Sequence, residues 1–142
     1  MDNKEFKIKY LCDTPKLREE GLMFKSPLAP DECAYFIFKH SNSLSFWNKN
    51  VSFDIDVIFC DETKKIQKIG HLKAGQEYPP TSVMTPCMYV IEVISQNFGK
   101  NNNFTHFIKK EDNIVFYNEK EESFFGNDIF QKFSSTIRSV RS

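Results

Sequence analysis

The chain has 142 residues, the length of one ordinary domain, and its 19 Lys and Arg residues balance 19 Asp and Glu residues. This balance excludes the strong positive field that steers proteins to nucleic acid or to anionic membranes. No stretch approaches the roughly 20 apolar residues of a membrane span, and MDNKEFKIKY lacks the apolar core of a signal peptide. We therefore expect a protein that binds neither nucleic acid nor membrane and acts in the cytoplasm, or within a particle assembled there.

The first two elements are predicted to be a strand and a short helix. Residues 6–12 (FKIKYLC) alternate apolar side chains with lysines, which is the period of a half-buried strand. The next segment, DTPKLREEG, offers Asp13 or Thr14 as an N-cap and Pro15 at or near the first helical position. Gly21 stands where such a helix ends, so we predict about two helical turns.

Six further segments of five to seven residues are rich in β-branched and aromatic residues, which favours strands. They are 34–38, 44–50, 55–61, 66–72, 88–94 and 113–119. The segments between them, HSNS, DETKK, GQEYPPTSVMTP and GKNNN, have the composition of turns and loops. Seven short strands predict an all-β domain over residues 1–118, a compact β-barrel or a jelly-roll-like sandwich.

The C-terminal extension, residues 119–142, has a different pattern. Its apolar residues recur every three or four positions, at Ile129, Phe130, Phe133, Ile137 and Val140. Asn127 or Asp128 could cap the N-terminus of a helix that begins there. We therefore predict a C-terminal amphipathic helix added to the β domain.

The cysteines and histidines do not have the spacing of metal ligands. Four cysteines, at positions 12, 33, 60 and 87, form no C-x-x-C pair, and the three histidines show no paired spacing either. The segment GHLKAG (70–75) has two glycines but lacks the strand-to-helix context of a phosphate loop. We therefore expect buried free thiols, no metal and no cofactor.

A candidate site surrounds the single tryptophan of the chain, Trp47. Two carboxylates interrupt apolar strands, Asp56 in IDVIFCD and Glu92 in MYVIEVI, and an unpaired buried charge costs several kcal/mol. Lys49 is the nearest cation in the sequence, and the amide of Asn50 can donate to a carboxylate. We predict that these five residues cluster, with Trp47 on one face of a strand over 44–50.

The sequence also resembles a known family. GLMFK (21–25), FWNKNVSFDIDVIFCD (46–61) and MYVIEV (88–93) are similar, in order and spacing, to the pattern of the domain-of-unknown-function 192 family. That resemblance implies a compact β-barrel-like or jelly-roll-like domain, and it implies no particular reaction. The site residues at positions of the family pattern are Trp47, Lys49, Asn50, Asp56 and Glu92. The chain departs from the pattern at Asn48, where the family has Met, and at Val51, where it has Thr.

Three interpretations of the cluster remain open. The favoured one is a non-enzymatic binding or assembly module, which holds a saccharide, peptide or protein partner through the Trp47 face or the C-terminal tail. Such a module could be an oligomer, or a structural component of a larger, phage-type particle. The second is an enzyme with Asp56 or Glu92 as general base and Lys49 as electrostatic stabiliser. The third is a closed polar network that only stabilises the fold.

Overall fold

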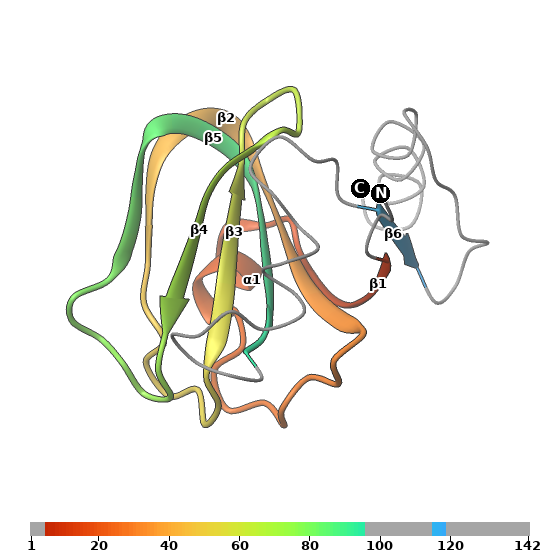
Figure 1. The fold of residues 1–142 in the computed structure, drawn as a ribbon, viewed down its shortest axis with the longest axis vertical. Helices are drawn as coiled ribbons and strands as arrows, with labels where there is room; N and C mark the ends of the chain where they lie inside the picture. The colour runs from red at the N-terminus through yellow and green to blue at the C-terminus, as the bar shows by residue number, and fades with distance from the viewer. Residues whose placement is uncertain (1–4, 96–114, 119–142) are drawn as a thin grey trace.

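The computed structural model describes residues 5–95 and 115–118, which form a sheet of six strands and one helix (Figure 1). The elements in chain order are β1 (Glu5–Cys12), α1 (Pro15–Glu20), β2 (Glu32–Phe46), β3 (Ile55–Cys60), β4 (Ile66–Leu72), β5 (Thr81–Ile94) and β6 (Val115–Asn118). Across the sheet the strands run in the order β4-β3-β5-β2-β1-β6. Most neighbours are antiparallel, and β1 runs parallel to both β2 and β6.

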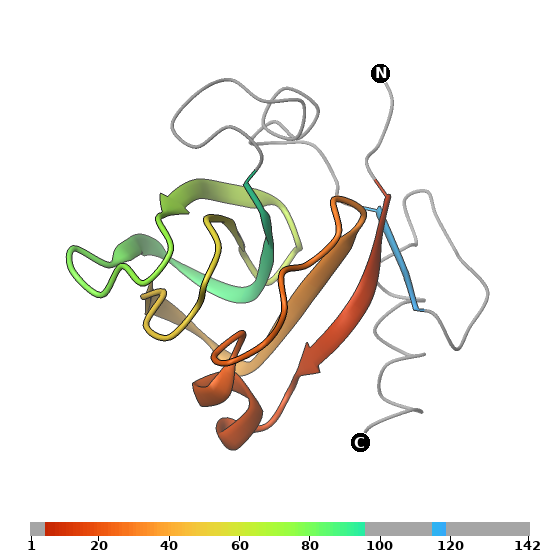
Figure 2. The ribbon, with the colours of Figure 1, turned by 90° about the horizontal axis from the view of Figure 1, so that it is seen from below.

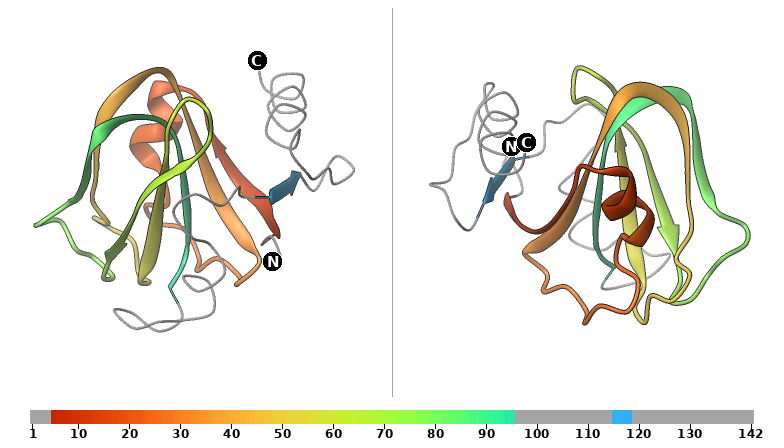
Figure 3. Two further views of the ribbon diagram at one scale, coloured as in Figure 1. Left: turned by 45° about the horizontal axis from the view of Figure 1, so that its top comes forward. Right: turned by 180° about the vertical axis from the view of Figure 1, so that it is seen from behind.

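Helix α1 follows the capping chemistry that the sequence indicates. The Thr14 hydroxyl accepts a hydrogen bond from the backbone N–H of Leu17 at 3.1 Å, and Pro15 is the first helical residue. Gly21 ends the helix with a φ of 50°, a conformation that glycine adopts at little cost. The helix leads from β1 back to its parallel neighbour β2 and lies beside β1 (Figure 3).

The sheet curls strongly because β2 and β5 are long and bend together as a pair (Figures 1 and 2). The curl brings β4 against the first half of β5, where the Lys68 ammonium donates to the carbonyl of Ser82 at 2.5 Å. A Cβ at Gly70 would lie only 2.0 Å from the Thr81 hydroxyl oxygen, so this close approach requires glycine. The predicted all-β, barrel-like fold class is confirmed.

Apolar side chains are buried on both faces of the sheet. All six residues of β3 are buried, as an apolar pattern on both parities of IDVIFC predicts. One face gathers Tyr35, Ile58 and Ile91, and the other gathers Phe36, Phe59 and Val90. Side chains of β3 and β5 therefore point alternately, residue by residue, into one or the other of two separate cores.

Two strand predictions are wrong at their boundaries. Segments 34–38 and 44–50 belong to the single strand β2, which ends at Phe46, so Trp47 lies in the loop after it. The stretch 81–86, expected to be part of a loop, is the first half of β5. The pairing of β2 with β5 shifts register between Asn42 and Leu44, and this irregularity accommodates Pro86, which cannot donate to a ladder.

Two points concern helices, the predicted C-terminal one and any that could span a membrane. The predicted amphipathic helix lies within residues 119–142, outside the residues that the structure describes. Within the described residues, no helix is long and apolar enough to cross a membrane.

Candidate functional site

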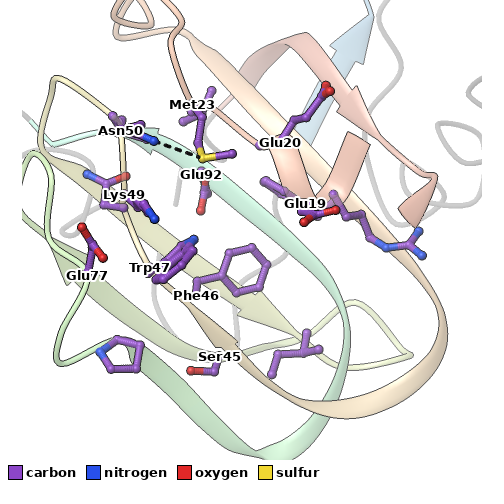
Figure 4. Close-up of a pocket in the computed structure, with 18 of the residues that line it drawn as sticks. Glu19, Glu20, Met23, Ser45, Phe46, Trp47, Lys49, Asn50, Glu77 and Glu92 are labelled. Atoms are coloured by element: carbon purple, nitrogen blue, oxygen red, sulfur yellow. Dashed lines mark hydrogen bonds between the residues drawn. The ribbon is translucent and has the colours of Figure 1, made fainter. Parts of the chain in front are cut away.

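A cleft of about 910 Å³ opens beside α1, at the end of β2 (Figure 4). It is bordered by α1 and the turn after it, by the second half of β2, by the loop 47–51 and by the loop that carries Glu77 and Tyr78. Its apolar lining includes Phe36, Phe38, Leu44, Phe46 and Trp47. Its volume is within the range of small-molecule sites, and its lining combines aromatic side chains with a few polar groups.

Asn48 fixes the loop that carries the tryptophan. Its side chain is buried and donates to the backbone carbonyls of Phe53 at 3.0 Å and Lys73 at 2.9 Å. Its backbone N–H donates to the carbonyl of Gln76 at 2.7 Å. Asn48 therefore ties three parts of the chain together, which gives the residue that departs from the family pattern a structural role.

The turn after α1 is joined to the same loop. The backbone N–H of Phe24 donates to the carbonyl of Asn50 at 2.9 Å, and both residues have positive φ, 62° and 60°. Such values are uncommon outside glycine, and they occur often at sites where the surrounding structure holds the backbone. The Asn50 amide lies 4.0 Å from the sulfur of Met23, and among residues 5–95 it makes no hydrogen bond to a carboxylate of the kind that the sequence suggested.

Trp47 forms an exposed wall of the cleft, with 49% of its surface accessible. The ammonium of Lys49 lies over its ring, 5.3 Å from the centroid, so the two residues make a cation–π contact. An aromatic face that is both exposed and next to polar groups is typical of surfaces that contact ligands.

Glu92 lies at the inner side of the cleft, between Met23 and Trp47 in the view of Figure 4. It is only 3% exposed, and its carboxyl group makes no hydrogen bond or ion pair within residues 5–95 and 115–118. Burial raises its pKa to about 8. The group is therefore mostly protonated at neutral pH, which spares the protein a buried, unpaired charge.

Asp56 does not join this cluster. It pairs across the sheet with Val93, one position from Glu92, so the two carboxylates point to opposite faces. The prediction that Asp56 lies with Trp47 and Lys49 is therefore wrong in its geometry. The structure brings together Trp47, Lys49, Asn50 and Glu92 along one cleft.

The partner of Asp56 is His71, a residue that sequence reasoning did not connect with it. The carboxylate oxygen Oδ1 of Asp56 lies 2.5 Å from the imidazole nitrogen Nδ1 of His71. Asp56 and His71 are directly opposed in the antiparallel pair of β3 and β4. Aligning 55–61 with 66–72 as a hairpin would have placed them opposite each other, and that was the missing signal.

The structure holds no arrangement that suggests a metal site in the part of the chain it describes. No group of three or more His, Cys, Asp or Glu side chains gathers there as a set of ligands. All four cysteines are buried and free, and burial raises the pKa of each thiol. Neutral, buried thiols are poor nucleophiles, so the cysteines offer no reactive group to the cleft.

The fold is that of a small, curled β-sheet domain, and in this chain an open cleft with aromatic walls lies at the end of β2. Sequence comparison is more specific, because the DUF192 family, described as "Uncharacterized ACR", matches residues 1–116. The chain belongs to this family, as the resemblance of its motifs predicted. No curated protein is significantly similar to it in sequence.

Two solved structures share the fold. One, from Sinorhizobium meliloti and described as a proposed transcription regulator, has a TM-score of 0.57 and 26% identity over 62% of this chain and 67% of its own. The other, a protein of unknown function from Novosphingobium aromaticivorans, has a TM-score of 0.60 and 24% identity over 64% of each chain. The similarity thus covers about two thirds of each of these proteins.

Proposed function

We propose that the chain is a non-enzymatic binding module that holds a small polar organic ligand, a saccharide or a peptide segment, in the cleft. The observation that carries the proposal is Glu92. A carboxyl group that is 3% exposed, lines a cleft and has no partner within the described residues is a polar group left for a ligand to satisfy.

The surroundings of Glu92 support the same function. The Trp47 ring gives an apolar wall, and the bracing by Asn48 holds the loop in place before any ligand arrives. A site that is already ordered loses less conformational entropy on binding. The rim adds charged side chains from α1 and from the Glu77 loop, which can orient a polar ligand.

An enzyme is the second candidate, and one observation favours it. A carboxyl group with a pKa of about 8 is suited to transfer protons near neutral pH. However, Asp56 lies on the other face of the sheet and pairs with His71. The three residues expected for catalysis, Asp56, Glu92 and Lys49, therefore do not lie in one site. A general acid or base without an identified nucleophile defines no reaction class.

An assembly role, in an oligomer or a phage-type particle, would be carried by the C-terminal tail. That tail lies outside the described residues, so the proposal rests on its apolar spacing alone. A location in the cytoplasm, or in such a particle, is likewise a proposal. The description of one relative as a transcription regulator adds no nucleic-acid role, because the formal net charge of this chain is zero.

A panel of saccharides and short peptides tests the binding function. Trp47 is the only tryptophan, so its emission reports directly on the wall of the cleft. We expect at least one panel member to shift this emission and to bind by calorimetry, more weakly to Glu92→Gln than to the native chain. Glu62→Gln, an exposed change in the turn between β3 and β4, is the matched control and should bind as the native chain does. A panel in which no member binds by either method would contradict the proposal.

A further inference from the structure

We infer that the group which the cleft recognises on its ligand is an organic cation, a protonated amine or guanidinium, seated between the Glu92 carboxylate and the Trp47 ring. This inference rests on the proposed binding function and adds the chemical class of the ligand. It narrows a panel of saccharides and peptides to molecules with a basic group, such as a lysine or arginine side chain.

The charges along the cleft are the first reason. Four acidic side chains line it, those of Glu19, Glu20, Glu77 and Glu92. None of them makes an ion pair or hydrogen bond with another residue in the described part of the chain. An excess of unpaired acidic groups around one opening favours a positively charged ligand.

The two cations that line the cleft do not neutralise these carboxylates. The guanidinium of Arg18 donates to the carbonyl of Ile37 at 2.8 Å and lies 5.0 Å from the centre of the Phe38 ring. The ammonium of Lys49 lies over Trp47 and forms no ion pair with the described residues. Both cations are therefore held by backbone and aromatic groups, and the carboxylates remain for a ligand.

The contact between Lys49 and Trp47 is the second reason. It shows that the ring presents a face where an ammonium group can lie, at 5.3 Å from the centroid. Glu92 lines the same opening, so a ligand cation that lies on the Trp47 ring shares the cleft with a buried carboxyl group. Aromatic rings combined with a carboxylate are well suited to hold organic cations.

Binding of a cation should also release a proton from Glu92. The titratable group that interacts with Glu92 among the described residues is the Cys12 thiol of β1, and the paired neighbours of Glu92 in β2 and β3, Ala34 and Val57, carry no charge. Glu20 at the end of α1 and Lys49 of the loop line the same cleft. The Cys12 thiol stays neutral, because burial and the nearby Glu92 charge raise its pKa to about 12. Glu92 is therefore the group whose ionisation a bound cation would change most.

Matched ligands test the inference on the full chain. The cationic probes are Nα-acetyl-lysine amide and Nα-acetyl-arginine amide, and their neutral counterparts are Nα-acetyl-norleucine amide and Nα-acetyl-citrulline amide. We expect each cationic probe to bind at least about tenfold more tightly than its counterpart, because only the charged group can pair with Glu92. Free pentylamine distinguishes a peptide side chain from a simple amine as the source of the cation.

The pH dependence and two variants sharpen the test. Between pH 6 and pH 8 the affinity of the lysine probe should rise by up to about tenfold per pH unit, because binding requires the ionised form of Glu92. Glu92→Gln should bind weakly at every pH, and Glu62→Gln should behave as the native chain. Lys49→Met should tighten binding, since it vacates the face of Trp47 that the ligand cation takes.

The outcomes separate this inference from the binding function itself. If neutral probes or saccharides bind as tightly as the cations, the cleft still binds ligands but the inference is overturned. Equal binding of the lysine probe to Glu92→Gln would also overturn it. If no probe and no panel member binds, both the inference and the proposed function fail.

Discussion

Asp56 and Glu92 lie in neighbouring strands, and both are acidic residues within apolar sequence. They differ in whether the structure gives the carboxyl group a partner. Asp56 is fully buried and lies 2.5 Å from the imidazole of His71. Glu92 is almost as buried, but it has no partner among the described residues and borders a cleft. The first belongs to a structural pair, and the second has no such partner in the part of the chain that the structure describes.

The difference shows that burial alone does not identify a functional carboxylate. A strand alternates its side chains between two faces, so one residue of offset decides between a core partner and an open cleft. The useful question is which partner the group has. The answer separates two residues that look alike in the sequence.

The largest expected effect is on the pH dependence of stability in Glu92→Gln. Burial raises the pKa of Glu92 from 4.5 to about 8, so the folded chain holds a proton that the unfolded chain has already lost within this window. The native chain should therefore lose stability as pH rises from about 4.5 to 8, by up to about 5 kcal/mol. Glutamine cannot ionise, so the variant should not show this loss. Urea unfolding of both proteins at pH 5 and pH 9 measures the effect, and a stability difference independent of pH would contradict it.

The next effect compares truncation of the two carboxylates at pH 7. Asp56→Ala removes the partner of His71 from a fully buried position, and breaking such a pair should reduce the free energy of unfolding by about 3 kcal/mol. Glu92→Ala should not reduce the free energy of unfolding, because no hydrogen bond is lost and the cost of holding the buried carboxyl group protonated at pH 7 disappears. Chemical unfolding checks both, and equal losses would remove the distinction.

Asn48→Ala should have a smaller effect, on the support of the cleft. The change removes two hydrogen bonds and leaves the carbonyls of Phe53 and Lys73 without that donor, at a cost of about 2 kcal/mol. The Trp47 loop should loosen, so hydrogen exchange of residues 47–51 should speed up more than that of β3. Unchanged exchange in this loop would show that Asn48 does not hold it.

The smallest effect is expected from Lys49→Met. The substitution removes the cation–π contact with a half-exposed tryptophan, which is worth about 0.5–1 kcal/mol at such a site. Trp47 emission should change, while the midpoint of unfolding should move little. A large loss of stability would mean that Lys49 belongs to a closed network rather than to the wall of an open cleft.

The sequence is sufficient to predict the class of fold and part of the site. Alternation in 6–12, the capping residues of α1 and the apolar runs of β3 and β5 depend on local patterns, and the structure agrees with them. The continuous strand β2 was missed because Ser and Asn residues at 41–43 have turn composition, although pairing with β5 holds them in the sheet.

The grouping of Asp56 with Glu92 failed for a different reason. Which face a side chain occupies depends on the register between β3 and β5, which is a long-range property. The bracing role of Asn48 was also not predictable, because its partners Phe53 and Lys73 are set by how two loops meet. Residue types could identify the polar groups but not their partners.

The most direct test of the central claim is the titration of the Glu92 side chain by carbon-13 NMR, with Glu92→Gln used to assign its carboxyl signal. We expect a pKa of about 8 in the free chain, and a lower value when Nα-acetyl-lysine amide is bound. A pKa near the ordinary value of 4.5 in the free chain would show that Glu92 is solvated or paired, and would contradict its role as the unsatisfied group of the cleft.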